Sequence, residues 1–118
     1  MMLENRSWSP MEKIWHIITM IPPGRVISYG KVADYAGLPG RARYVSKALK
    51  TAPDAMQLPW HRVINSQGKI SFKENSAAFQ EQMELLRLEG IEVIRGRVKL
   101  LNYEWRPDMA TLVMAMPF

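Results

Sequence analysis

The chain has 118 residues, of which 47% are hydrophobic, so it is long enough to bury the core of one small domain. It contains no cysteine, which excludes disulfides, thiolate metal sites and cysteine nucleophiles. The 16 lysines and arginines outnumber the 11 aspartates and glutamates and give a formal charge of +5, which favours a polyanionic partner such as nucleic acid. A basic soluble protein without such a partner fits this charge equally well.

The sequence gives little support to a membrane segment, a secretory signal or a metal site. No stretch approaches the roughly 20 apolar residues of a membrane span, and residues 1–13 lack the basic and apolar regions of a secretory signal. His16 and His61 lie far apart in the chain, so we expect no metal ion or cofactor. We expect one domain over residues 1–118, monomeric and away from membranes, in the cytoplasm (with the nucleoid in a bacterium) or in a eukaryotic nucleus.

The first predicted helix begins with Ser9, Pro10 and Glu12, which match an N-cap, a first-turn proline and the acid of a capping box. Apolar residues then recur at the spacing of one helix face: Ile14, Ile17, Ile18 and Ile21. The helix ends at Pro22-Pro23-Gly24. His16 lies within it without a partner at helical spacing, so we interpret it as a packing or exposed residue.

Two short helices are predicted next. Val26 and Ile27 form a short extended piece, and Ser28 can cap a helix that runs through about Ala36. After a break at residues 37–40, the segment RARYVSKALKTA has an apolar side and a basic side. Two helices about a glycine-containing turn indicate a helix-turn-helix, whose second helix would face DNA. An ordinary amphipathic helix with a solvated basic face fits this segment about as well.

Short extended segments and a further helix are expected in the second half. Residues 63–64 and 70–72 flank Asn65-Ser66-Gln67-Gly68, which is typical of a hairpin or of a turn between extended segments, and this unit could serve as a wing. A helix should start at Asn75 or Ser76 and end at Gly90. The fold class expected is therefore mainly α with short β, a winged helix-turn-helix domain.

The C-terminal quarter carries weaker signals. Residues 91–105 could supply two short strands about Arg95-Gly96. The end of the chain, MATLVMAMPF, is apolar but too short to span a bilayer. We expect it to pack on the domain or to contact a partner.

The most informative run is PWHRVINSQGKIS, which follows IPPGRVISYGKVADYAGLPGRARYVSKAL and precedes LLRLEG. This ordered series resembles the DNA-binding domain of the alkylguanine-DNA alkyltransferases, whose hallmark is PCHRV after a helix-turn-helix that starts with IPxGxVxSYGxxA. The resemblance covers about residues 11–94. It implies a winged helix-turn-helix domain that binds DNA.

The acceptor residue of that family is missing here. In the alkyltransferases the cysteine of PCHRV takes the alkyl group, and a neighbouring histidine and a later glutamate help to form its thiolate. His61 and Glu89 match those supporting positions, whereas Trp60 stands at the acceptor position. An indole has no useful nucleophilicity near neutral pH, and the chain has no other cysteine, so direct alkyl transfer is excluded.

Replacement of the cysteine, often by tryptophan, is what defines the alkyltransferase-like proteins, and the chain resembles them. The resemblance implies a non-enzymatic damage sensor. It would bind guanine alkylated on the 6-oxygen in double-stranded DNA by nucleotide flipping, and flag it for nucleotide excision repair proteins.

The resemblance also implies roles for single residues. Arg43 matches the arginine that inserts into the base stack, and Tyr29 matches the tyrosine that assists nucleotide rotation and contacts the flipped base. Trp60 would line the alkylguanine pocket, and Val63 would offer its backbone carbonyl to the guanine edge. Lys73, where relatives can carry an arginine, is either a pocket residue or a solvated lysine. The helix facing DNA would present Arg41, Tyr44, Ser46 and Lys47.

Three departures from the alkyltransferase pattern are expected to matter. Tyr44 replaces a small residue and should change how closely the helix enters a groove, and Ala52 replaces an asparagine that supports the site. Asn75 and Ser76 replace a glycine-rich loop, which predicts a wider pocket that tolerates bulky alkyl groups. Two other functions stay open: a winged-helix regulator that reads intact sequence, and an enzyme that uses His61 and Glu89 to remove the alkyl group with water.

Overall fold

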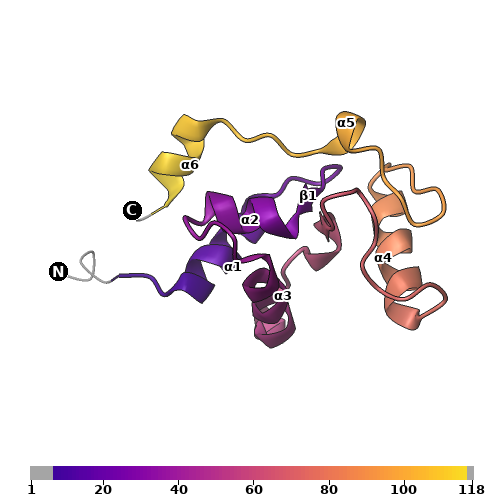
Figure 1. Ribbon diagram of the computed structural model, residues 1–118, viewed down its shortest axis with the longest axis horizontal. Helices are drawn as coiled ribbons and strands as arrows, with labels where there is room; N and C mark the ends of the chain where they lie inside the picture. Colours follow the sequence, from indigo (N-terminus) through magenta and orange to yellow (C-terminus); the bar gives the residue numbers. More distant parts are fainter. Residues whose placement is uncertain (1–6, 117–118) are drawn as a thin grey trace.

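The computed structural model describes residues 7–116, and expectations for residues 1–6 and 117–118 lie outside that range (Figure 1). The described part is elongated, with extents of 50 × 27 × 25 Å. The elements follow in the order α1 (Pro10–Met20), β1 (Ile27–Ser28), α2 (Tyr29–Tyr35), α3 (Ala42–Thr51), the 3-10 helices η2 (Asp54–Met56) and η3 (Trp60–Arg62), β2 (Val63–Ile64), α4 (Ala77–Leu88), α5 (Leu100–Tyr103) and α6 (Met109–Ala115).

Helix α1 packs against α2 and α3, and its predicted start is confirmed. The amide of Glu12 donates to Ser9 Oγ at 3.1 Å, and the Ser9 amide donates to Glu12 Oε1 at 2.8 Å, which completes the capping box. The isoleucines Ile14, Ile17 and Ile18 are fully buried. Trp15 follows Ile14 in the same helix, and its indole N–H donates to the carbonyl of Ala48 at 2.8 Å, which fixes α1 against α3.

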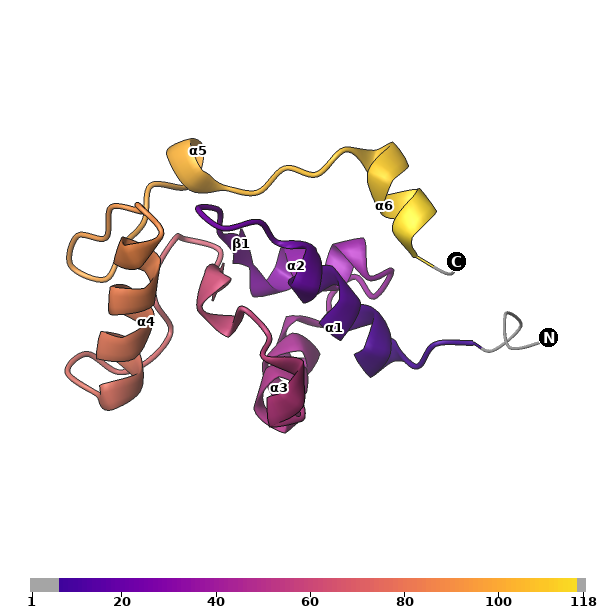
Figure 2. The same ribbon diagram turned by 180° about the vertical axis from the view of Figure 1, so that it is seen from behind.

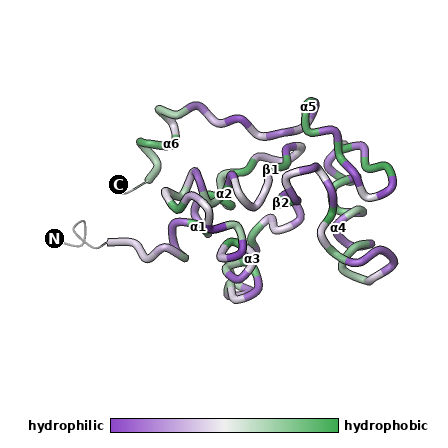
Figure 3. The backbone as a smooth tube through the Cα atoms, in the orientation of Figure 1, coloured by the Kyte–Doolittle hydropathy of each residue, from purple (hydrophilic) through white to green (hydrophobic). Residues whose placement is uncertain are grey.

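Helices α2 and α3 form the predicted helix-turn-helix. Ser28 caps α2 by accepting from the Lys31 amide at 3.2 Å, and α2 ends at Tyr35, close to the expected Ala36. The turn closes where the Leu38 amide donates to the carbonyl of Ala33 at 2.8 Å. Hydrophilic and hydrophobic residues alternate along α3 (Figure 3), because its apolar side packs inward while its basic side faces outward. The mainly helical fold class with a small sheet is confirmed.

Of the two alternatives predicted after PWHRV, the hairpin is wrong, and the turn between segments that do not pair as a hairpin is confirmed. Strand β2 pairs in parallel with β1, in the register Ile27 with Val63 and Ser28 with Ile64. The turn at residues 65–68 does form, but the segment after it bridges to Arg97 and not back to β2. The physical reason is burial: between the helices both Val63 and Ile64 lose all exposure to water, which a two-stranded hairpin on the surface would not achieve.

The turn before Ile70 requires glycine. Gly68 has a φ of 82°, and a Cβ atom at this position would lie 2.5 Å from the carbonyl oxygen of Val98. That close approach brings the two segments together, and the Val98 amide donates to the Gly68 carbonyl at 2.8 Å. The turn therefore fixes the direction in which residues 70–72 leave the sheet.

Helix α4 begins where the sequence predicts it, because Ser76 accepts from the Phe79 amide at 3.1 Å. It ends before Gly90, which has the left-handed φ of 82° expected of the residue after a helix. The two strands expected about Arg95-Gly96 are wrong: these residues form a tight turn flanked by one isolated bridge between Ile94 and Arg97.

The C-terminal segment crosses α2 on the side opposite α3, as both Figure 1 and Figure 2 show. It starts as an extension of the sheet edge, where the Trp105 amide donates to the Val26 carbonyl at 2.7 Å. Leu112 of α6 and the following Met116 are buried in the core beside α1 and α2. The expectation that this segment packs on the domain is confirmed for residues 109–116. None of the helices within residues 7–116 is long and apolar enough to cross a membrane.

Candidate nucleic-acid interface

Helix α3 presents a row of cations to solvent. Arg41, Arg43, Lys47 and Lys50 are all exposed, and the helix contains no acidic residue. The Arg41 guanidinium lies 5.0 Å from the ring centre of Tyr44, whose own side chain packs partly against the core. Within residues 7–116 no carboxylate pairs with Arg43, Lys47 or Lys50. These charges are therefore available to an anionic partner.

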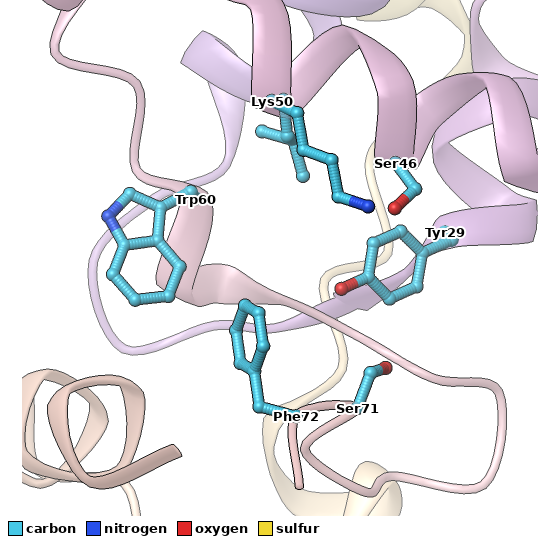
Figure 4. A pocket seen from close by; sticks show the side chains of 7 residues that line it. Tyr29, Ser46, Lys50, Trp60, Ser71 and Phe72 are labelled. Atoms are coloured by element: carbon cyan, nitrogen blue, oxygen red, sulfur yellow. The ribbon is translucent and has the colours of Figure 1, made fainter. Parts of the chain in front are cut away.

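A cavity of about 340 Å³ opens beside α3. Four different parts of the chain meet around it: the start of α2, the outer face of α3, the 3-10 helix η3 and the segment after the Gly68 turn (Figure 4). Its walls are formed by Tyr29, Ser46, Leu49, Lys50, Trp60, Ser71 and Phe72. The mixture of aromatic faces and a few polar groups is typical of a pocket that binds a flat organic ring.

Trp60 and Phe72 form an aromatic wall on one side of this cavity. The rings of Trp60 and Phe72 meet edge to face, with 6.1 Å between their centres and an interplanar angle of 81°. In Figure 4 the indole nitrogen of Trp60 lies on the side away from Tyr29, so Trp60 offers carbon atoms to the cavity. The Tyr29 hydroxyl points toward Phe72. This wall can stack on a base but supplies no nucleophile.

Arg43 lies beside the cavity and not in its wall. A second, smaller cavity of about 230 Å³ shares Tyr29, Ser46 and Ser71 with the first and is also lined by Ala42 and Arg43. Arg43 therefore lies next to the residues that line the first cavity. That placement is compatible with the base-stack role that the resemblance implies for Arg43.

The structure brings Tyr29, Trp60 and Ser46 together but does not bring Val63 or Lys73 into the cavity wall. The Val63 side chain is fully buried, as expected, and its carbonyl already accepts from Gln82 Nε2 at 3.0 Å. Lys73 is exposed outside the cavity. The pocket roles given to these two residues stay predictions.

The sequence did not predict every residue that lines the cavity, and some predictions about residues near it stay untested. Phe72 and Lys50 line the wall without having been assigned there; the one available signal was that Lys50 follows Ser46 by four residues and so shares its helix face. Asn75 and Ser76 do not line the cavity, so the wider pocket inferred from them stays a prediction. Ala52 lines only a neighbouring groove.

The residues that would assist a cysteine are held in a separate network. Glu89 Oε2 lies 2.7 Å from His61 Nε2 and 2.7 Å from Arg62 Nη2, and its Oε1 accepts from the Gly24 amide at 2.9 Å. Arg62 also donates to the Ile21 carbonyl at 2.8 Å. The network joins the end of α1, the 3-10 helix η3 and the end of α4. Sequence reasoning identified His61 and Glu89 but missed Arg62.

The electrostatics of this network favour an ionised Glu89. Burial alone would raise the pKa of the carboxyl group, but hydrogen bonds from Arg62, the Gly24 amide and His61 outweigh it and lower the pKa from 4.5 to about 2. At neutral pH the carboxylate is therefore charged and can only accept, so His61 Nε2 donates the hydrogen bond to it. His61 and Glu89 bind each other and do not line the cavity, and this arrangement gives no support to a hydrolytic dyad.

The comparison with known protein families decides the assignment. Residues 9–91 match the family model described as the DNA binding domain of 6-O-methylguanine DNA methyltransferase. The chain belongs to this family. Within it, the chain is 49% identical over 96 residues to the DNA base-flipping protein of Vibrio parahaemolyticus, which covers 80% of the chain and 94% of that protein. The Escherichia coli DNA base-flipping protein is 41% identical over 95 residues, with 80% of the chain and 72% of that protein covered.

Solved structures of family members share the fold. Schizosaccharomyces pombe Atl1, in complex with damaged DNA containing O6-carboxymethylguanine, has a TM-score of 0.75 at 38% identity over 83% of the chain and 95% of Atl1. The Mycobacterium tuberculosis enzyme OGT in complex with DNA has a TM-score of 0.61 at 30% identity over 92% of the chain and 58% of OGT. The match to both supports the helix-turn-helix assignment of α2 and α3.

Membership of the family does not bring its transfer chemistry. Relatives that match over 80% of the chain are named DNA base-flipping protein and alkyltransferase-like protein, and the chain has no cysteine at any position. Trp60 occupies the acceptor position and forms part of an aromatic wall. This family member is therefore not an alkyltransferase.

Proposed function

We propose that the chain is a non-enzymatic sensor of alkylated DNA, which binds double-stranded DNA at guanine alkylated on the 6-oxygen and holds the damaged nucleotide outside the base stack. The observation that carries this proposal is the aromatic cavity beside the exposed cations of α3. The names of its relatives, DNA base-flipping protein and alkyltransferase-like protein, and the damaged DNA bound by S. pombe Atl1 support it.

Attraction to the DNA backbone comes first. The cations of α3 neutralise phosphates and release condensed counterions, which is favourable on any sequence. Affinity should therefore fall with salt, by a slope of about −0.9 in log K against log salt for each phosphate neutralised. This step positions α3 but does not distinguish damaged from intact guanine.

Recognition of damage follows from the cost of extruding a base. Alkylation on the 6-oxygen weakens the pairing of guanine with cytosine, so the few kcal/mol needed to unpair and unstack the nucleotide are reduced. The freed base stacks against the aromatic wall of Trp60 and Phe72, with Tyr29 at the opposite side of the cavity. Arg43, in the adjoining cavity, fills the gap left in the stack with its flat guanidinium.

Without a nucleophile the complex persists instead of reacting. We propose that the long-lived, distorted complex is itself the signal, and that nucleotide excision repair proteins recognise it. In this proposal the chain binds DNA as a monomer, in the compartment that holds the DNA. Addition of the purified excision-repair recognition protein to the complex should give a slower-migrating species. Failure to form it on damaged DNA would contradict the repair link while leaving lesion binding intact.

A titration of matched duplexes tests the core of the proposal. The duplexes differ by one O6-methylguanine, the titration is made at several salt concentrations, and the lesion is analysed afterwards. We expect tighter binding to damaged DNA with the lesion unchanged. Equal affinity for both duplexes, together with a preferred intact sequence, would instead support a winged-helix regulator. Restored guanine and released alcohol under multiple turnover would support a water-using enzyme.

A further inference from the structure

The wall of the cavity contains one charged side chain, and that charge is positive. Apart from Lys50, every lining side chain is aromatic, aliphatic or a neutral hydroxyl. In Figure 4 the side chain of Lys50 extends from α3 in the direction of Tyr29, and Tyr29, Ser46 and Lys50 all line the cavity. The carboxylates of Asp54 and Glu81 lie in an adjoining groove that shares Leu49 and Trp60, and they do not line this cavity.

The ammonium group of Lys50 is unpaired in the part of the chain that the structure describes. Within residues 7–116, neither an ion pair nor a hydrogen bond holds its ammonium group, whereas Lys31 is paired with Glu104 at 2.8 Å. The stem of Lys50 follows the same face of α3 as Ser46, one turn later, so the charge belongs to the cavity side of the helix. An anion that enters the cavity would give this group its first partner.

We propose that Lys50 makes the pocket selective for guanines whose 6-oxygen carries a group ending in an anion, such as a carboxylate. This inference rests on the proposed function, because it assumes that the alkylated base enters the cavity. A group on the 6-oxygen extends the base toward the cavity wall. Bound DNA covers the opening and excludes water, so an unpaired carboxylate there would lose its hydration without compensation. A nearby ammonium group supplies the missing hydrogen bond and opposite charge.

The neighbouring cations are not placed to bind an anion inside this cavity. Lys73 does not line the cavity, and Arg43 lines the adjoining cavity, where the proposed function assigns it to the base stack. Lys47 lies on α3 one turn before Lys50 but is absent from the wall of either cavity. Selectivity for an anionic adduct therefore depends on Lys50, while Lys47 contributes to DNA attraction in general.

The test uses three duplexes of one sequence, with unmodified guanine, O6-carboxymethylguanine or O6-carbamoylmethylguanine at the same position. The two adducts have nearly the same shape, and only the first is anionic. We expect the chain to bind the carboxymethyl duplex roughly ten- to twentyfold more tightly than the carbamoylmethyl duplex, the lower end of the value of one hydrogen bond to a charged group. Lys50→Met keeps a long unbranched side chain without the charge and should reduce that ratio to about one.

Lys47→Met is the matched control, since it removes the same charge from the same helix. It should weaken binding to all three duplexes to a similar extent and leave the ratio between the adducts unchanged. If both adducts bind more tightly than unmodified DNA but with equal affinity, or if the ratio survives in Lys50→Met, the inference is overturned and the proposed function stands. If neither adduct binds more tightly than unmodified DNA, the proposed function itself fails.

Discussion

The Glu89 network and the aromatic cavity are neighbours in the fold, but their polar groups are used in opposite ways. Both oxygens of Glu89 accept hydrogen bonds from the protein, from Arg62, His61 and the Gly24 amide. In the cavity, by contrast, the ammonium group of Lys50 has no protein partner within residues 7–116. Polar groups that are already satisfied stabilise the fold, and groups left open are available to a ligand.

The difference shows that residues which assist a nucleophile in related enzymes can serve a structural role where the nucleophile is absent. In this chain the histidine and glutamate that match the alkyltransferase positions tie η3 to the end of α4. They hold Trp60 in place, because Trp60 and His61 are adjacent in η3. The network is therefore expected to matter for stability, and the cavity for binding damaged DNA.

The largest expected effect is the loss of Arg62. Its side chain is 14% exposed and donates to both Glu89 and the Ile21 carbonyl. Arg62→Ala leaves a largely buried carboxylate with two of its three partners and without its cation, and we expect the free energy of unfolding to fall by about 3 kcal/mol. Urea denaturation at pH 7 measures it. A loss below about 0.5 kcal/mol, as at an ordinary surface site, would contradict a structural role for the network.

The pH dependence of stability provides the next test. Because the folded pKa of Glu89 is about 2 and the ordinary value is 4.5, the charged network stabilises the fold fully above pH 4.5 and loses that stabilisation as pH falls toward 2. Glu89→Gln should lower the free energy of unfolding at neutral pH by about 2 kcal/mol and flatten its dependence between pH 4.5 and 2. Identical acid-unfolding curves for the two proteins would contradict the lowered pKa.

Substitutions in the cavity wall should reduce DNA binding more than they reduce stability. Trp60→Ala and Phe72→Ala each remove a stacking surface, and we expect affinity for DNA with one alkylated guanine to fall roughly tenfold. Phe72 is 38% exposed, so its replacement should change stability little, and it is the cleaner of the two variants. Titrations with damaged and intact duplexes separate the effects. Equal loss on both duplexes would show that the rings do not contact the damaged base.

The smallest effect is expected from a change that keeps the charge of Arg43. Arg43→Lys retains attraction to phosphates but loses the planar group that fills the base stack. We expect the preference for damaged DNA to fall about threefold with an unchanged salt slope, since one charge-assisted contact is weakened but no phosphate contact is lost. Arg43→Ala should reduce the salt slope as well. If lysine fully replaces arginine, the role of Arg43 is purely electrostatic.

Local features of the fold were predictable because their causes lie within a few residues. Ser9, Ser28 and Ser76 each cap a helix by accepting from an amide three residues later, and such short-range patterns are visible in the sequence. The parallel pairing of Ile27 with Val63 was not predictable in this way. Two adjacent β-branched residues mark Val63 and Ile64 as extended, but the partner of this strand is chosen by burial between helices that lie far away in the chain.

Sequence alone determined that this family member transfers no alkyl group, because the identity of one residue, Trp60, and the absence of cysteine settle the chemistry. It also determined the excess of positive charge and the helix that carries much of it. Only the tertiary structure decided which side chains share a cavity: the Gly68 turn brings Phe72 to Tyr29, and the packing of α2 against α3 brings Lys50 there. Such meetings depend on packing between distant segments, which no local pattern encodes.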